Sequence, residues 1–224
     1  DVVIATKGGH YLFDTPDRIP RVNETEIRKD LEESLLTMGL DVIDFYWLHR
    51  DDETKSAEEI MDILERLRRE GKIRYYGLSN YRTERLEKAE TYMRSKGLPG
   101  PYAVSNQWSM ASVNPGKNTN PDPTLVELTE EEYRWHCAAQ IPSVPFSSTA
   151  MGFFEKLKEE TGYSLQTLSA AYLISSPFQV FPVTGARNTE QLEDIVRAGE
   201  IYIEPERFRL NGYDSGKRSE NIIR

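Results

Sequence analysis

The sequence predicts an α/β protein whose parallel β-sheet is flanked by helices, as in a (β/α)8 TIM barrel. Six short apolar segments alternate along the chain with segments of helical periodicity, which is the pattern of a parallel sheet. Repeated right-handed crossovers suit either a closed barrel or an open doubly wound sheet. No G-x-G-x-x-G motif follows any of the apolar segments, which disfavours the dinucleotide-binding open sheet.

The number of units predicts part of a barrel. A complete barrel has eight units in roughly 250 residues, whereas six units are found in this chain of 224 residues. We expect a single domain over residues 1–224, and a longer parent polypeptide, because the first predicted strand has nothing before it to hold its register. If the chain were complete, two bare strand edges would favour aggregation or pairing with a partner strand.

The predicted strands are short runs of bulky apolar residues that end in polar or glycine-containing turns. The strongest run extends from Val42 to Leu48 and lacks strict alternation, which is typical of a parallel strand buried on both faces. It stops abruptly at His49. The six strands are expected at residues 2–5, 42–48, 73–78, 102–106, 141–146 and 180–183.

The predicted helices have capping residues at their ends. Pairs such as Asn23 with Glu26 have the spacing of a capping box, and Gly39 stands where a left-handed cap is favoured. The helices are expected between Asn23 and Gly39, Ser56 and Gly71, about Leu86 and Gly97, Thr129 and Ala139, Ser164 and Pro177, and from Asn188 onward.

Composition excludes several classes of partner. The chain has 37 acidic and 28 basic residues, a net charge of −9, which argues against nucleic acid as the main partner. Its single cysteine, Cys137, cannot form an intrachain disulfide, so a cytoplasmic location is favoured. No apolar run approaches the roughly 20 residues that span a bilayer, so no membrane contact is predicted. Assembly into a homo-oligomer stays open.

Polar residues that follow the strands are the candidate functional groups, because α/β folds place their chemistry at the carboxyl ends of strands. His49 is the first candidate, since it directly follows the buried run. A strand-end lysine such as Lys7 is more often a surface charge, and Ser79 and Asn80 could be turn or cap residues. The three histidines lack metal-ligand spacing, so no metal site is predicted, and the other two are expected to be structural or exposed.

Six segments along the chain, which extend to about Ala198, read VVIATKGGH, DLEESLLTMGLDVIDFYWLHRDD, GKIRYYGLSN, SNQWSM, IPSVPFSS and FPVTGARNTEQLED. In sequence and in order they resemble the aldo-keto reductase family, in particular its bacterial oxidoreductase branch. The resemblance implies a (β/α)8 barrel of which units three to eight are present. It also implies reduction of a small aldehyde or ketone, with NADP(H) bound at the carboxyl ends of the strands.

The same resemblance assigns catalytic residues. Lys7 and His49 match two members of the family's catalytic set, whereas its tyrosine and aspartate would lie before residue 1, so the given chain alone would lack the proton donor. Hydride delivery to a carbonyl carbon builds negative charge on the oxygen, which requires a proton donor and fixed dipoles. A lysine ammonium can tune a phenol for this task, and an imidazole can orient the carbonyl oxygen.

The resemblance also assigns cofactor-binding residues. Gly185 and Ala186 stand where many relatives have a Lys-Ser pair, which leaves Arg187 as the fixed charge in that turn. The helix that begins after Asn188 would direct its amino terminus at the 2′-phosphate. The implied contacts are Ser79, Asn80 and Gln107 to the nicotinamide carboxamide, Phe146 stacked on the nicotinamide, Ser147 and Ser148 at the pyrophosphate, and Gly185, Arg187, Gln191 and Asp194 at the adenosine 2′-phosphate and adenine.

The alternative function is a non-catalytic NADP(H)-binding regulatory or scaffold subunit with the same fold. A tyrosine upstream of this sequence would favour the enzyme, whereas its replacement by phenylalanine would favour the subunit.

Overall fold

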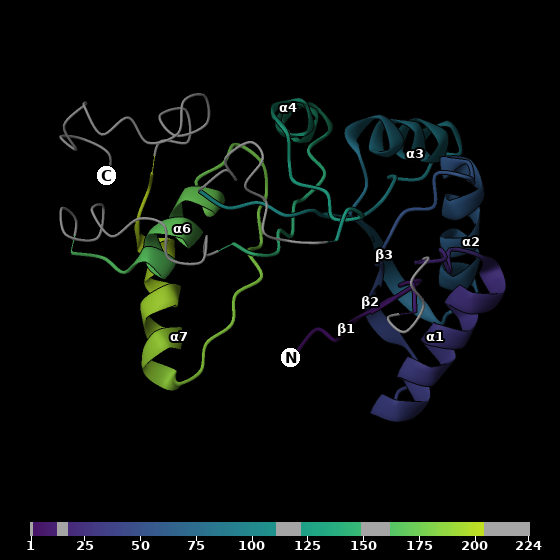
Figure 1. Cartoon of the computed structure of the whole chain (residues 1–224), viewed down its shortest axis with the longest axis horizontal. Coiled ribbons are helices and arrows are strands. Elements are labelled where there is room, and N and C mark those ends of the chain that lie inside the picture. The colour runs from purple at the N-terminus through teal and green to yellow at the C-terminus, as the bar shows by residue number, and fades with distance from the viewer. Residues whose placement is uncertain (1, 13–17, 111–121, 149–161, 204–224) are drawn as a thin grey trace. The chain divides into compact units, whose positions relative to one another are not determined.

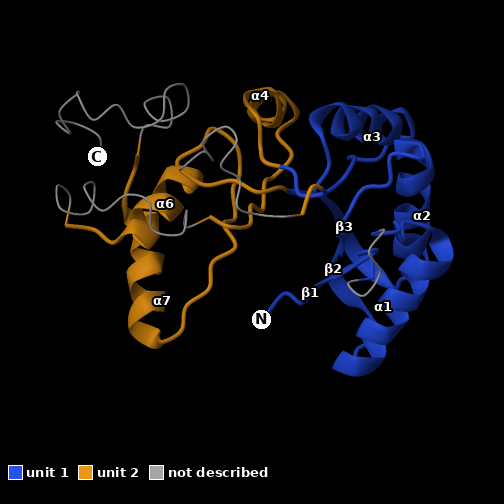
Figure 2. Cartoon of the chain, in the orientation of Figure 1, with its two compact units in different colours: residues 1–105, 124–126 blue, residues 106–123, 127–224 orange. Residues whose placement is uncertain are grey.

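The computed structural model describes residues 2–12, 18–110, 122–148 and 162–203. The chain divides into two compact units (Figure 2). Unit 1 consists of Asp1–Ser105 with Thr124–Val126, and unit 2 of Asn106–Pro123 with Glu127–Arg224. The single domain over residues 1–224 stays a prediction, and each unit is described separately. No helix among the described residues is long and apolar enough to cross a membrane.

Unit 1 contains a parallel four-stranded sheet in the order β1-β2-β3-β4. Its strands are β1 (Ala5–Gly8), β2 (Ile43–Leu48), β3 (Ile73–Ser79) and β4 (Val104–Ser105). In the register of the sheet, Lys7 pairs with Trp47, Leu48 with Leu78, and Ser79 with Ser105. The predicted parallel sheet is therefore confirmed in this unit.

Helices α1 (Glu24–Met38), α2 (Ala57–Arg69) and α3 (Thr83–Ser95) connect these strands, and Figure 1 shows them along one side of the sheet. The hydroxyl of Tyr46 donates to the Ile27 carbonyl of α1 at 3.2 Å, and that of Tyr76 donates to Glu65 of α2 at 3.2 Å. Because side chains alternate along a strand, Trp47 and its neighbours across the sheet point to the opposite face.

The predicted helix caps are confirmed, which explains where the helices begin. Asn23 accepts a hydrogen bond from the Glu26 amide at 3.0 Å, and Ser56 accepts one from the Glu59 amide at 3.1 Å. Gly39 adopts the left-handed conformation with φ 65° after α1. Each cap binds a backbone group that the first or last helical turn leaves without a partner.

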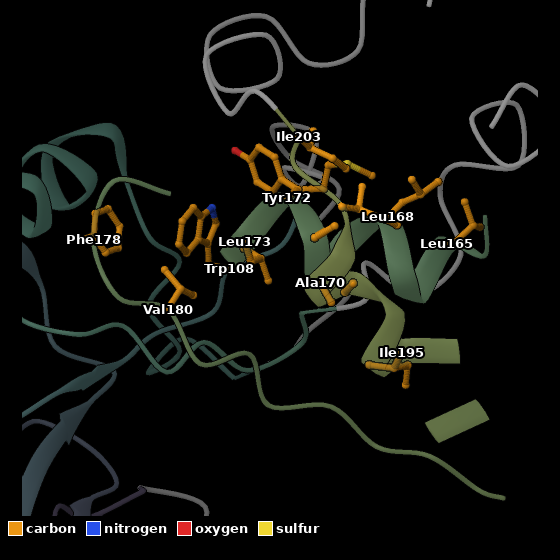
Figure 3. Packing of buried hydrophobic residues seen from close by; sticks show 14 of the residues in the cluster. Trp108, Leu165, Leu168, Ala170, Tyr172, Leu173, Phe178, Val180, Ile195 and Ile203 are labelled. Atoms are coloured by element: carbon orange, nitrogen blue, oxygen red, sulfur yellow. The ribbon is translucent and has the colours of Figure 1, made fainter. Parts of the chain in front are cut away.

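Unit 2 contains α4 (Glu130–Ala139), α6 (Leu165–Ile174), α7 (Thr189–Val196) and the 3₁₀-helix η2 (Arg197–Glu200). Its core is an apolar cluster centred on α6 (Figure 3), in which Trp108 stacks on Phe178 with ring centroids 6.0 Å apart. Leu168 and Leu173 of α6 are fully buried in the same cluster. The helix predicted between Ser164 and Pro177 is therefore present and contributes to the core.

Several predicted strand boundaries were wrong. The predicted strands at 141–146 and 180–183 form isolated parallel bridges, Ser143 with Val180 and Phe146 with Gln107, among the described residues. Pro142 and Pro145 have no backbone N–H, so they interrupt the ladder that the apolar pattern suggested.

The first and fourth strands also differ from the prediction. β1 begins at Ala5 rather than residue 2, because its pairing with β2 starts at Phe45 and leaves Val2 and Val3 exposed. The regular ladder with β3 covers Val104 and Ser105, so β4 is shorter than the predicted 102–106, although the Tyr102 N–H also donates to the Tyr76 carbonyl at 3.0 Å.

Gly77 provides a test of how closely the sheet is packed. A Cβ atom added there would meet the Trp47 ring and lie 2.7 Å from the Ala103 carbonyl oxygen. Gly77→Ala should therefore lower the free energy of unfolding by about 1–3 kcal/mol, measured by urea denaturation. Gly199→Ala is the matched control, because nothing lies within 4 Å of its added Cβ. Equal stability of the two variants would contradict the described packing.

Candidate active site

Lys7 lies on β1, on the face of the sheet opposite α1 and α2. Its Nζ donates to the hydroxyls of Ser79 at 3.3 Å and Ser105 at 3.4 Å, and lies 5.4 Å from the centroid of the Trp47 ring. The parallel register explains this arrangement. Trp47 pairs with Lys7, and Ser79 pairs with Ser105 two residues closer to the carboxyl end of the sheet, so all four side chains lie on the same face. The side chain therefore runs toward the carboxyl ends of the strands.

The electrostatic environment of Lys7 is unusual for an ammonium group. Burial, together with the smaller effect of the nearby positive charge of Arg50, lowers its pKa to about 8. Among the residues that the structure describes, Lys7 forms no ion pair with a carboxylate; its polar contacts are the two serine hydroxyls. Such a lysine can change its protonation state near neutral pH, which suits a role in proton transfer.

His49 follows β2 directly and continues its register beside β1. Its backbone N–H donates to the Gly8 carbonyl at 2.8 Å, and its partly buried ring contacts the His10 ring with centroids 4.5 Å apart. The structure therefore places Lys7 and His49 on neighbouring strands of one sheet, at the same end. His10 lies against this group, although the sequence analysis gave it no functional role.

Ser79 and Asn80 form the end of β3. Ser79 donates to the Ser105 carbonyl at 2.8 Å, so its oxygen is oriented to accept from Lys7. Asn80 is 3% exposed and left-handed at φ 63°, and its amide nitrogen donates to the His49 carbonyl at 3.1 Å and to Ser79 at 3.2 Å. Its amide oxygen accepts from the Val126 N–H at 3.1 Å. Asn80 therefore ties strand ends together.

Charged residues that sequence reasoning did not single out brace the loop after His49. Arg85 of α3 makes a two-point ion pair with Asp51, at 2.7 and 2.9 Å, and donates to the Lys55 carbonyl at 2.8 Å. Arg50 is 7% exposed and donates to the His49 carbonyl at 2.8 Å. The charged run after the apolar strand is visible in the sequence and suggests a polar loop after His49. It does not show that Arg85 is the partner of Asp51.

The remaining predicted cofactor residues belong to unit 2. Gln107 and Phe146 are brought together by a parallel bridge, in which the Trp108 N–H donates to the Phe146 carbonyl at 3.3 Å. Ser147 is exposed with φ 55°. Ser148 is buried, and its hydroxyl lies 2.9 Å from the carbonyl oxygens of both Pro145 and Val183. Of the two serines, Ser147 is the accessible one.

The segment from 185 to 194 comprises the turn before α7 and most of that helix. The Asn188 side chain caps α7 by accepting from the Gln191 N–H at 2.9 Å, and the Gln191 side chain accepts from the N–H of Arg187, the residue before the cap, at 2.8 Å. Gly185 and Arg187 are exposed, whereas Asp194 is partly buried with its carboxylate 3.9 Å from Arg197. The exposed Arg187 therefore stands at the positive end of a helix.

Comparison with known proteins identifies the family. The model of the aldo/keto reductase family matches residues 1–161 and 144–210. The chain belongs to this family. It is 26% identical to 6-dehydroglucose reductase of Agrobacterium fabrum over 85% of this chain and 62% of that protein. It is 24% identical to an NADP(+) aryl-alcohol dehydrogenase of Phanerodontia chrysosporium over 80% of this chain and 54% of that protein.

A solved structure confirms the fold class. The thermostable aldo-keto reductase Tm1743, in complex with the inhibitor epalrestat, superposes with a TM-score of 0.65 at 19% identity, over 93% of this chain and 69% of that chain. Together with the family match, this similarity confirms the predicted (β/α)8 barrel class, and the parallel sheet of unit 1 is consistent with part of such a barrel. Family membership makes the protein an oxidoreductase of the carbonyl-reducing type.

The lowered pKa of Lys7 predicts a pH dependence of stability. In an unfolded chain a lysine titrates near 10.4, so between pH ~8 and ~10.4 the unfolded chain binds more protons at residue 7 than the folded chain does. The free energy of unfolding should therefore gain a contribution as pH rises through this window. Lys7→Met should remove that contribution, measured by urea denaturation at several pH values.

Lys29→Met is the matched control, because Lys29 is exposed on α1. A Lys7→Met variant whose stability follows the same pH dependence as the wild type would contradict the assigned environment of Lys7.

Proposed function

We propose that the protein reduces a small aldehyde or ketone to the alcohol with NADPH, with Lys7 and His49 in the active site. The observation that carries the proposal is the partly buried Lys7 ammonium, held by serine hydroxyls at the strand ends beside His49, in a chain of the aldo/keto reductase family. The names of two relatives, a 6-dehydroglucose reductase and an NADP(+) aryl-alcohol dehydrogenase, support this substrate class and this cofactor.

The residues of unit 1 would act on the carbonyl oxygen. His49 would donate a hydrogen bond to that oxygen and orient it, while Lys7 would lower the pKa of a neighbouring proton donor through its positive charge. NADPH would supply the hydride. The lowered pKa of Lys7 indicates that this ammonium needs a nearby carboxylate to remain charged at higher pH, which is the role of the family's aspartate.

The residues of unit 2 would hold the cofactor. Gln107 and Phe146, which share a bridge, would contact the nicotinamide, and the exposed Ser147 would contact the pyrophosphate. Arg187 at the amino terminus of α7 fits a 2′-phosphate, because a guanidinium and a helix amino terminus both favour an anion. This pairing favours NADPH over NADH. The rest of the site for the adenosine end of the cofactor would be formed by Gly185, Gln191 and Asp194. Gln191 would hold the turn in place by accepting from the Arg187 N–H.

Replacement of His49 tests the proposal. His49→Ala should lower kcat for carbonyl reduction by about 100-fold, because a donor to the developing oxyanion is lost. The affinity for NADPH, measured by its fluorescence, should stay within about twofold, because the imidazole would contact the substrate in this proposal. NADH should bind more weakly than NADPH.

His10→Ala is the matched control, because it removes the neighbouring ring and should retain most of the activity. Equal loss of turnover and NADPH affinity in His49→Ala would contradict the assigned role. Turnover-free binding of NADPH by the wild type would favour the regulatory subunit instead.

A further inference from the structure

Asn106, the residue before Gln107, is held by a buried carboxylate. Its amide nitrogen lies 2.9 Å from each of the two carboxylate oxygens of Glu132, in the first turn of α4. Both side chains are 1% exposed. Burying a carboxylate costs free energy unless hydrogen bonds satisfy its oxygens. The buried position of Glu132 therefore requires an explanation.

His136 lies one helical turn after Glu132 and is fully buried. Its Nδ1 lies 2.7 Å from the Ile141 carbonyl oxygen, to which it donates, and its Nε2 lies 3.6 Å from Glu132. The imidazole stacks on Phe178 with centroids 4.8 Å apart. The buried carboxylate therefore lies between the Asn106 amide and the His136 imidazole, and burial raises the pKa of Glu132.

The backbone around Gln107 is fixed by bonds to Leu128, just before α4, and to Phe146. The Gln107 carbonyl accepts from the Leu128 N–H at 2.8 Å, and the Asn106 carbonyl accepts from the Phe146 N–H at 3.3 Å. Thr129, next to Leu128, caps α4 by accepting from the Glu132 N–H at 3.1 Å. The start of α4 thus holds this segment twice, through the Leu128 backbone and through the Glu132 side chain.

We propose that Asn106 and Glu132 are positioning residues for Gln107, and that their contact fixes the backbone from which Gln107 binds the nicotinamide carboxamide. The inference rests on the proposed function, in which Gln107 contacts the cofactor. Buried polar contacts of this kind add little net stability but restrict the conformations available to a segment. A ligand group must be held closely to be effective, because small displacements weaken its hydrogen bonds strongly.

Two substitutions of similar size separate positioning from packing. Glu132→Gln keeps an oxygen that can accept from Asn106, and its amide nitrogen can donate to Nε2 of His136, so it should bind NADPH within about twofold of the wild type. Glu132→Met has no acceptor and leaves the Asn106 amide without this partner. It should weaken NADPH binding by about tenfold, the effect of roughly one lost hydrogen bond.

Comparing two ligands shows whether the nicotinamide end of the cofactor is affected. NADPH affinity is measured by fluorescence, and the affinity for 2′,5′-ADP, which lacks the nicotinamide, by competition. Glu132→Met should leave the affinity for 2′,5′-ADP within about twofold. Gln107→Ala should weaken NADPH similarly, and the double variant should be no weaker than Gln107→Ala, because both changes remove the same contact.

Equal loss of both ligands in Glu132→Met, additive losses in the double variant, or unchanged NADPH binding would each overturn the positioning role. If Glu132→Met does not fold, Asn106→Ala tests the same contact from its other side. A wild type that binds neither ligand would refute the proposed function itself, whereas a wild type that binds both would leave that function standing whatever the variants show.

Discussion

The parallel register of β1, β2 and β3 is the constraint on which the site in unit 1 depends. Because Lys7 pairs with Trp47 and Leu48 pairs with Leu78, the residues that follow β2 and β3 emerge level with one another. A shift of one residue would turn Lys7 to the helix-covered face. Tyr46 and Tyr76 oppose such a shift, because each hydroxyl is bonded to a helix on that face.

The strand ends are held by polar side chains rather than by apolar packing alone. Asn80 connects β3 to the His49 carbonyl, and Arg85 connects α3 to the loop after His49 through Asp51. In unit 2, Glu132 performs the corresponding task for Asn106. Buried polar contacts of this type contribute modestly to net stability, and here each lies within two residues of a side chain assigned to substrate or cofactor.

Local sequence patterns predicted the helices and their caps. Contacts between residues far apart in the sequence could not be predicted in this way. Asn23 and Ser56 cap helices as expected, because a cap depends on residues three positions apart. The ion pair of Asp51 with Arg85 joins residues 34 apart in sequence, and periodicity carries no information on such a partner. The apolar run at 141–146 misled the prediction, because hydrophobicity outweighed the missing N–H of Pro145.

The most direct test of the central claim is the pattern of backbone amide chemical shifts when NADP⁺ is added to the isotope-labelled protein. If the carboxyl ends of the strands form the cofactor site, the largest shifts should occur at Asn80 and Gln107, which follow β3 and β4, with little change at Ile43 and Ile73 at the opposite ends of their strands. Large shifts at Ile43 and Ile73, with none at Asn80 and Gln107, would contradict the account.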